Sequence, residues 1–333
     1  MKRFLLKSLL YSTPIIVPII YFTIFINPHL SGDIGPLGYV SFPKEYANGI
    51  SLNDNVVNCG YNIPDCQKYD ILTIGDSFSQ STYSNSYNSF LADYVTSNVF
   101  NHNPNWGINP FNRFILLSKM KTLPRLIIIE SAERYLIDRL IKINFDLTSE
   151  DMIAYNIVDT TAFELPRKKS ILAKTQEWTK RILGIYENPI HHCVLSKSYF
   201  TCSNKENDLY FYVDDITHIN TSQNNLDNAI LKLDSLFSYA NTLDIDLYVL
   251  IAADKYDIYQ DYIINNQYPK ADVLERLTEK YAHPNLINSK DTLSKMVADG
   301  IKDIYWCNDT HWSPIGSEAV AKQVLEIINC QTN

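Results

Sequence analysis

Patterns typical of buried strands alternate with patterns typical of amphipathic helices over residues 69–328. Short apolar runs predict strands at residues 69–74, 98–106, 123–130, 244–253 and 285–288. Apolar residues that share one helical face predict helices at residues 86–97, 110–121, 225–241, 270–282 and 314–328. Alternation of this kind predicts an α/β fold, in which helices cover both faces of a parallel sheet. Active sites in such folds lie at the carboxyl ends of the strands.

The N-terminal segment predicts a membrane anchor. Three basic residues, Lys2, Arg3 and Lys7, precede an apolar run. The run covers residues 8–26, and about 19 apolar residues are enough to span a bilayer core. The positive-inside rule places the N-terminus in the cytoplasm and the rest of the chain outside. The alternative is a cleaved signal peptide, which the length of the run and the lack of a small-residue cleavage motif after it disfavour.

The expected organisation therefore has three parts. A cytoplasmic tip and transmembrane anchor occupy residues 1–27, and a Gly- and Pro-rich stalk occupies residues 28–68. One α/β domain occupies residues 69–330. Residues 140–222 lack the regular alternation, and we interpret them as an insertion with a β-hairpin expected at residues 199–213.

Charge and cysteine content restrict the function and the compartment. The formal net charge is -8, and no cluster of basic residues indicates a nucleic-acid partner. The six cysteines all follow the predicted anchor, and an oxidising compartment favours disulfides. Six cysteines allow about fifteen pairings, of which neighbours in sequence are our prediction. The predicted pairs are Cys59–Cys66, Cys193–Cys202 and Cys307–Cys330. A zinc site is disfavoured because no Cys-x-x-Cys motif occurs.

Two short motifs contain residues suited to nucleophilic catalysis. Gly75-Asp76-Ser77-Phe78 directly follows the first predicted strand, and Asp309-Thr310-His311-Trp312 directly precedes the last predicted helix. A serine hydroxyl is a weak nucleophile, and an adjacent histidine can activate it by taking its proton. A carboxylate then orients the imidazole and stabilises its charged form. The motifs therefore predict acyl-transfer chemistry.

The two motifs together resemble the SGNH/GDSL hydrolase superfamily. Within it they resemble the periplasmic polysaccharide O-acetyltransferases related to the alginate acetylation enzymes. The resemblance implies Ser77 as nucleophile, His311 as base and Asp309 as orienting acid. It also implies a flavodoxin-like three-layer α/β/α sandwich with a parallel sheet.

The resemblance further implies an oxyanion hole. The backbone N–H groups of Ser77 and Gly107 are its expected donors. The asparagine that usually follows the third strand in this superfamily is absent, since Glu130-Ser131-Ala132-Glu133-Arg134 occupies that region. Arg134 or Asn109 could supply the third donor.

Further residues near these motifs are expected to bind substrate. For the tryptophans, packing in the core is an equal alternative. For Glu133 the alternative is a salt bridge with its neighbour, and for Lys255 it is simple solvent exposure. The expected substrate-binding residues are Asp76, Trp106, Glu133, Lys255, Tyr259 and Trp312.

These features predict an extracytoplasmic O-acetyltransferase that acts on a polysaccharide or oligosaccharide. Its catalytic domain is expected in the periplasm or outside the cell, and neither a cofactor nor a metal is expected. The resemblance implies a multipass membrane O-acyltransferase as the partner that supplies acetyl groups. The enzymatic alternative is a carbohydrate esterase or deacetylase with the same triad. The non-enzymatic alternative is a carbohydrate-binding scaffold with an inactive triad.

Overall fold

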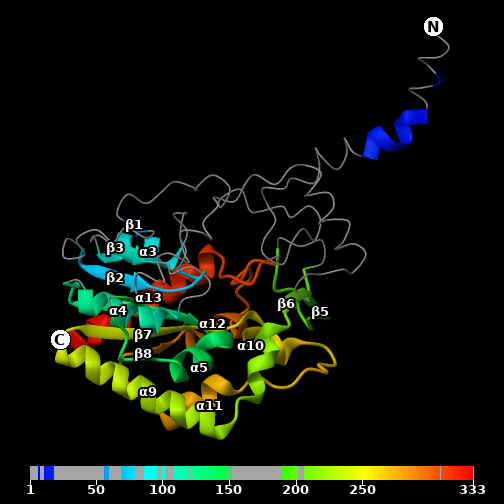
Figure 1. The fold of residues 1–333 in the computed structure, drawn as a ribbon. Coiled ribbons are helices and arrows are strands. Elements are labelled where there is room, and N and C mark those ends of the chain that lie inside the picture. Colours follow the sequence, from blue (N-terminus) through cyan, green and yellow to red (C-terminus); the bar gives the residue numbers. More distant parts are fainter. Residues whose placement is uncertain are drawn as a thin grey trace.

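A computed structural model describes most of the predicted α/β domain (Figure 1). The described residues are 7, 11–18, 56–59, 69–79, 86–95, 99–102, 109–120, 122–148, 150–151, 190–201, 206–307 and 309–332. Their main feature is a six-stranded sheet with the order β1-β3-β2-β4-β7-β8, in which all neighbours are parallel. Its strands are β1 (Val56–Cys59), β2 (Ile71–Ile74), β3 (Val99–His102), β4 (Leu126–Ala132), β7 (Asp246–Ala252) and β8 (Leu286–Asn288).

The strand order is that of a doubly wound fold. Taken in chain order, β3-β2-β4-β7-β8 corresponds to the order 2-1-3-4-5 of flavodoxin-like sheets, and β1 extends the sheet beyond β3. One helical layer contains α3 (Tyr87–Val95), α12 (Ser289–Ala298) and α13 (Pro314–Thr332), and the opposite layer contains α4 (Pro110–Met120), α5 (Glu133–Ile141) and α9 (Gln223–Thr242) (Figure 1). The predicted parallel α/β architecture is confirmed.

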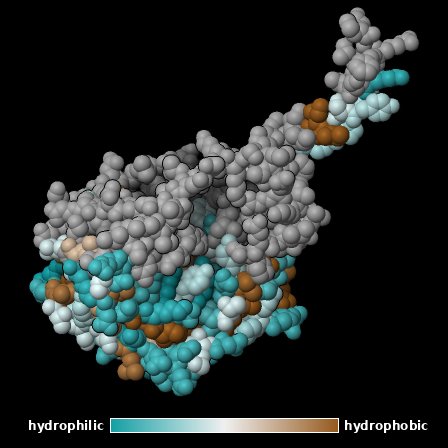
Figure 2. All heavy atoms as spheres, viewed as in Figure 1, coloured by the Kyte–Doolittle hydropathy of each residue, from teal (hydrophilic) through white to brown (hydrophobic). Residues whose placement is uncertain are grey.

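The central strands are buried on both faces because helices cover both. All four residues of β2 are buried, and Ile127, Ile128 and Ile129 of β4 are fully inaccessible. Continuous apolar runs are typical of parallel strands that are covered on both sides. On the face that Figure 2 shows, the described residues are mainly hydrophilic, and apolar residues lie among them in small groups.

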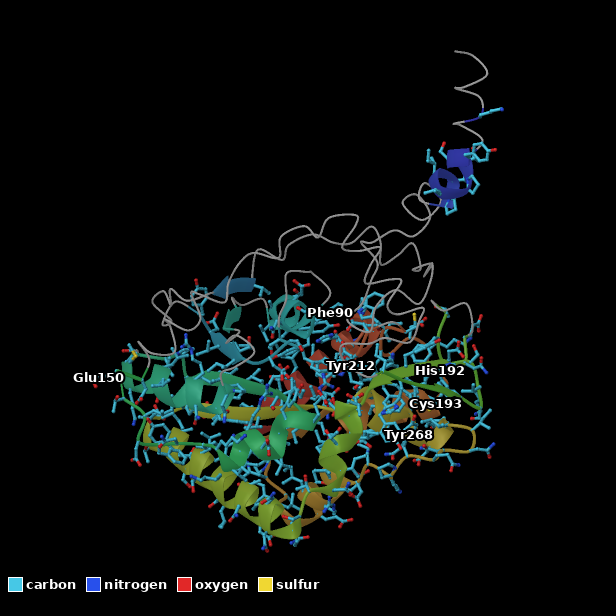
Figure 3. The ribbon with its side chains drawn as sticks, turned by 45° about the vertical axis from the view of Figure 1, so that its right-hand side comes forward. Phe90, Glu150, His192, Cys193, Tyr212 and Tyr268 are labelled. Carbon is cyan, nitrogen blue, oxygen red and sulfur yellow. The ribbon has the colours of Figure 1, made fainter. Side chains whose placement is uncertain are left out.

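Short helices occupy the connection before α9 and the connection between β7 and β8. They are α8 (Asp214–Thr217), η3 (His218–Asn220), α10 (Lys255–Tyr259), η4 (Gln260–Tyr262) and α11 (Val273–Lys280). α8 and α10 pack against a separate antiparallel hairpin of β5 (Ile190–Val194) and β6 (Asp208–Tyr212). Figure 3 shows this hairpin through His192 and Cys193, which lie near Tyr268 and far from Glu150.

The predicted strands and helices are all found, with small shifts at their ends. Several described elements were not predicted: β1 within the expected stalk, α5 mostly before the expected insertion, α12, and the short helices α8, η3, α10 and η4. The hairpin was placed wrongly, because its first strand is β5 at residues 190–194 and not a segment after residue 199. That strand, Ile-His-His-Cys-Val, lacks the apolar alternation by which strands are recognised.

The predicted Cys307–Cys330 disulfide is wrong. Cys330 lies near the end of α13, which has 19 residues and rises about 1.5 Å per residue. The helix therefore carries Cys330 away from Cys307, which is buried just before it, whereas a disulfide needs Cα atoms within about 7 Å.

The predicted Cys193–Cys202 disulfide is also not formed. Cys193 is an unbonded thiol on β5, and the residue that faces it across the hairpin is Leu209. Cys202 lies outside the described residues, as does Cys66 of the third predicted pair, Cys59–Cys66.

The predicted anchor lies mostly outside the described residues. Residues 11–18 are helical, and residues 19–27 are among those not described. Within the described part of the chain, no helix combines the length and the apolar character needed to cross a membrane.

Candidate active site

The loop after β2 lies at the topological switch point of the sheet. β3 and β4 flank β2 on its two sides, so the chain leaves β2 and β3 in opposite directions across the sheet. Ligand sites in open parallel sheets form outside the strand ends at this point. The loop contains Ser77, which is half-buried. The backbone N–H of Asp76 donates to Glu130 Oε2 at 3.0 Å and so ties the loop to β4.

Gly75 is required by the close approach of its neighbours. A Cβ atom at this position would lie 2.1 Å from Ser79 Oγ and 2.4 Å from Glu130 Oε2. Ser79 Oγ itself donates to Glu130 Oε2 at 2.8 Å. Burial, and then the charge of Asp76, raise the pKa of Glu130 well above its ordinary value. The glycine thus allows the turn to fold tightly over a buried carboxyl group.

The Asp76 carboxylate links the loop after β2 to β4 and to α5. Its carboxylate accepts hydrogen bonds from the backbone N–H of Ala132 at 3.0 Å and from Arg139 Nη1 at 2.6 Å. Burial alone would raise the pKa of Asp76, but the Arg139 charge and these hydrogen bonds outweigh burial and lower the pKa to about 2. The expectation that Asp76 binds substrate therefore has a structural alternative: an ionised carboxylate that joins β2, β4 and α5.

Arg139 was not identified from the sequence. It lies on α5, and its guanidinium reaches back to Asp76 and to Ser131 Oγ, the latter at 2.8 Å. Helical side chains point towards the N-terminus of their helix, and here that terminus follows β4 directly. An arginine two turns into the helix after a central strand was the signal that could have indicated it.

The second motif forms a closed turn. Ser313 N–H donates to the carbonyl of Ile304 at 2.9 Å, and Trp306 N–H donates to that of His311 at 3.2 Å. Asp309 Oδ1 accepts the backbone N–H of His311 at 2.9 Å and also contacts Nδ1 of the imidazole. Asp309 and His311, which are two residues apart, therefore contact each other directly. Because the carboxylate contacts Nδ1, Nε2 is the nitrogen that can act as a base.

The two motif loops meet in space. The ring of Phe78, the residue after Ser77, lies 4.9 Å from the imidazole of His311 between centroids. The same ring lies 4.7 Å from that of Trp312. Ser77 and His311, far apart in the sequence, are thus carried by loops that pack against each other at the carboxyl end of β2.

Two aromatic residues expected to bind substrate lie in the core. Trp312 is 4% exposed and donates its indole N–H to Tyr305 Oη at 3.1 Å. Tyr259 is fully buried and packs against Phe200 with centroids 5.3 Å apart. Trp312 therefore packs in the core, which was the alternative considered for it. Tyr259 also packs in the core and has no exposed ring face to which a sugar could bind.

The expected oxyanion donors are only partly described. Trp106 and Gly107 lie outside the described residues. Asn109 accepts the backbone N–H of Phe111 at 3.0 Å at the start of α4, and its amide donates to the carbonyl of Arg139 at 2.6 Å. Its side chain therefore braces α4 against α5, which is a structural role.

Arg134 belongs to a buried network of charged residues. Its Nη1 bridges Asp215 at 2.9 Å and Asp254 at 2.5 Å. Glu133 accepts the backbone N–H of Asp254 at 2.9 Å and faces His218 Nε2 at 3.2 Å. These pairs join α5 to α8, η3 and the end of β7. The partners of the Arg134 guanidinium are therefore carboxylates.

Three members of this network could hold a cation. Ligand atoms of Glu133, His218 and Asp254 all lie within 4.8 Å of one another. However, Arg134 already pairs with Asp254, and His218 already bonds to Glu133. A network of ion pairs accounts for this geometry without a metal, and Glu133 has the structural role considered as its alternative.

The network predicts a stability that depends on pH. Burial alone lowers the pKa of His218, but the hydrogen bond to Glu133 and the charges of Asp254 and Glu133 raise it to about 9. Protonated His218 therefore stabilises the fold fully below its ordinary pKa of 6.5, and this contribution is lost as the pH rises through about 9. Urea unfolding should show a fall on the order of 3 kcal/mol across this window. In His218→Gln this fall should be absent, and an equal fall in that variant would contradict the assignment.

The position of Lys255 in the structure contradicts an alternative that the sequence had suggested. Solvent exposure was the alternative considered for this lysine, but the residue is fully buried. Its ammonium contacts the backbone of the turn that carries Asp309 and His311. A buried ammonium is costly unless it is hydrogen-bonded, and the carbonyls of this turn provide the bonds.

Part of the chain matches a known protein family. Residues 208–332 match a family described as SGNH hydrolase-like domain, acetyltransferase AlgX. The match covers less than half of the chain and includes β7, β8, α13 and the motif with Asp309 and His311, but not the loop with Ser77. No curated protein matches the chain.

Proposed function

We propose that this protein transfers acetyl groups to a carbohydrate through an acyl-enzyme, since residues 208–332 match the SGNH hydrolase-like domain of the acetyltransferase AlgX. The proposed triad is Ser77, His311 and Asp309. One observation carries the proposal: the Phe78 ring packs on the imidazole of His311, whose Nδ1 contacts Asp309. The loop of the serine and the oriented base are therefore neighbours.

In the first half-reaction, His311 Nε2 takes the proton of Ser77 Oγ as this oxygen attacks the acetyl carbonyl carbon. The C–O bond to the donor then breaks, and the imidazolium returns the proton to the leaving oxygen. The product is an acetyl ester on Ser77. The backbone N–H groups of Ser77 and Gly107 are the proposed donors to the negatively charged oxygen of the tetrahedral intermediate.

In the second half-reaction, a sugar hydroxyl takes the place of the leaving group. His311 accepts its proton as the sugar oxygen attacks the acetyl carbon, and the bond to Ser77 Oγ breaks. The proton then returns to Ser77. Asp309 stays ionised throughout and stabilises the imidazolium that forms in each half-reaction.

The proposed location is outside the cytoplasm. Three basic residues followed by an apolar run support a single-pass anchor with the N-terminus inside. Acetyl-CoA is a cytoplasmic donor, so an external enzyme needs acetyl groups to be carried across the membrane. A multipass membrane O-acyltransferase is the proposed partner, and a cell-surface or exported polysaccharide is the proposed acceptor.

Hydrolysis is a second candidate function. The same triad serves an esterase if water replaces the sugar hydroxyl in the second half-reaction. The hydrolase-like description of the matched domain supports this alternative.

One experiment separates these functions. The purified full chain is incubated with p-nitrophenyl acetate, with and without a panel of oligosaccharides, and the products are identified by mass spectrometry. We expect an oligosaccharide whose mass rises by one acetyl group, formed together with p-nitrophenol. Free acetate as the sole acetyl product would identify an esterase. The absence of p-nitrophenol release would contradict both and favour a carbohydrate-binding scaffold.

A further inference from the structure

Lys255 links the end of a central strand to the turn of the second motif. It is the first residue of α10 and lies three residues beyond the end of β7. Its Nζ donates to three backbone carbonyls, those of Trp306 at 2.7 Å, Cys307 at 3.1 Å and Asp309 at 3.1 Å. The lysine therefore binds the backbone of this turn at three residues, one of which, Asp309, also contacts the imidazole.

The ammonium of Lys255 makes three hydrogen bonds to this turn. An ammonium group has three N–H donors, and three carbonyls of one short turn accept from it. Carbonyls of successive residues do not converge on one point unless the backbone is bent around that point. The ammonium therefore stabilises the bent form of the turn, and its removal would take one hydrogen-bond donor away from each of the three carbonyls.

Lys255 is itself held rigidly. The residue before it, Asp254, donates its N–H to Glu133 and pairs with Arg134 at 2.5 Å. The carbonyl of Ala253 accepts the hydroxyl of Tyr305 at 2.7 Å. On the side-chain end, Lys255 Nζ lies 5.1 Å from the ring centroid of Phe200, a distance typical of a cation–π contact.

We propose that Lys255 is a positioning residue for the reaction: its ammonium holds the 306–309 turn in the form from which Asp309 orients His311 towards Ser77. The inference rests on the proposed triad. It assigns no contact between Lys255 and the substrate, because the side chain ends on the backbone of the turn. This replaces the earlier expectation that Lys255 binds substrate.

The test compares Lys255→Met with Lys255→Arg and with a matched control, Lys290→Met. Methionine keeps the length of the side chain and removes the donors, whereas arginine keeps the charge and N–H donors. Lys290 is also largely buried, but it pairs with Asp257 and Glu275, each at 2.5 Å. The control therefore removes a buried ammonium from the same region without touching the turn.

For Lys255→Met we expect kcat with p-nitrophenyl acetate to fall about 100-fold, the cost of misplacing a catalytic group by about 1 Å. KM should change less than about threefold, because the acyl donor is not contacted. Lys255→Arg should recover about tenfold of the loss, since it keeps donors to the carbonyls. Lys290→Met should keep the wild-type kcat. A wild-type kcat in Lys255→Met, or an equal loss in Lys290→Met, would overturn the proposal.

A second measurement does not depend on activity. Hydrogen exchange of the backbone amides of Asp309 and His311 should be at least about tenfold faster in Lys255→Met than in wild type, because the turn opens more often. In Lys290→Met it should be unchanged. Ser77→Ala serves as the reference in the kinetic assay: if wild type and Ser77→Ala turn over equally, the triad is wrong, whereas the exchange data still decide whether Lys255 holds the turn. Unchanged exchange in Lys255→Met would overturn the positioning role.

Discussion

Ser77→Ala is expected to lower kcat for p-nitrophenyl acetate by about 10⁴- to 10⁶-fold, because the hydroxyl that accepts the acetyl group is gone. The remaining rate would come from binding and from donors to the oxyanion. Rapid quenching of the wild-type reaction followed by peptide mass spectrometry should find one acetyl group on the peptide that contains Ser77. The variant should carry none.

The matched control for this prediction is Ser86→Ala. Ser86 lies in the same connection between β2 and β3, and its hydroxyl accepts the N–H of Ser89 at 3.3 Å at the start of α3. Its loss should destabilise the helix by about 1 kcal/mol and leave the acyl-enzyme intact. An acetyl group that still forms in Ser77→Ala, or that is found on Ser79 in the wild type, would refute Ser77 as the nucleophile.

Asp309→Asn is expected to lower kcat by about 10⁴-fold, as for triads in which the orienting acid is replaced by its amide. The carboxylate contacts Nδ1 of His311 and accepts the backbone N–H of the same residue. An amide can donate a hydrogen to Nδ1, which would leave the proton on Nε2, the nitrogen that must accept it from Ser77. It also removes the negative charge that stabilises the imidazolium.

Asp246→Asn is the matched control for Asp309→Asn. Asp246 forms an exposed ion pair with Arg125 at 2.9 Å, at the amino end of β7 and thus at the opposite end of the strand from the proposed site. Its replacement should leave kcat unchanged and cost less than about 1 kcal/mol of stability. If Asp309→Asn kept more than about a tenth of the wild-type kcat, another group would have to orient the imidazole.

Ionisable residues support the two loops that carry Ser77 and His311. Asp76, Glu130 and Arg139 hold the loop after β2, while Lys255 holds the turn before α13. All four lie at or beyond the carboxyl ends of the central strands β2, β4 and β7. The sheet therefore positions the site through buried polar groups that link neighbouring strands.

Local patterns in the sequence were sufficient to predict five strands of the main sheet, most of its longer helices and the two motifs. Apolar runs such as residues 126–129 and 247–252 reveal buried parallel strands, because helices cover both faces of each strand there. The Asp309-x-His311 spacing was informative for a similar reason, since both residues lie in one turn and contact each other directly. Contacts within a few residues are visible in a linear pattern.

The tertiary structure revealed contacts that local sequence patterns could not predict. The packing of Phe78 on His311, the hold of Lys255 on a turn 51 to 54 residues away, and the contact of Arg139 with Asp76 all join distant segments. No periodicity encodes such contacts, because they arise from the order in which the strands lie side by side. The same holds for Cys307 and Cys330, which are consecutive cysteines in the sequence but are separated by the length of a helix.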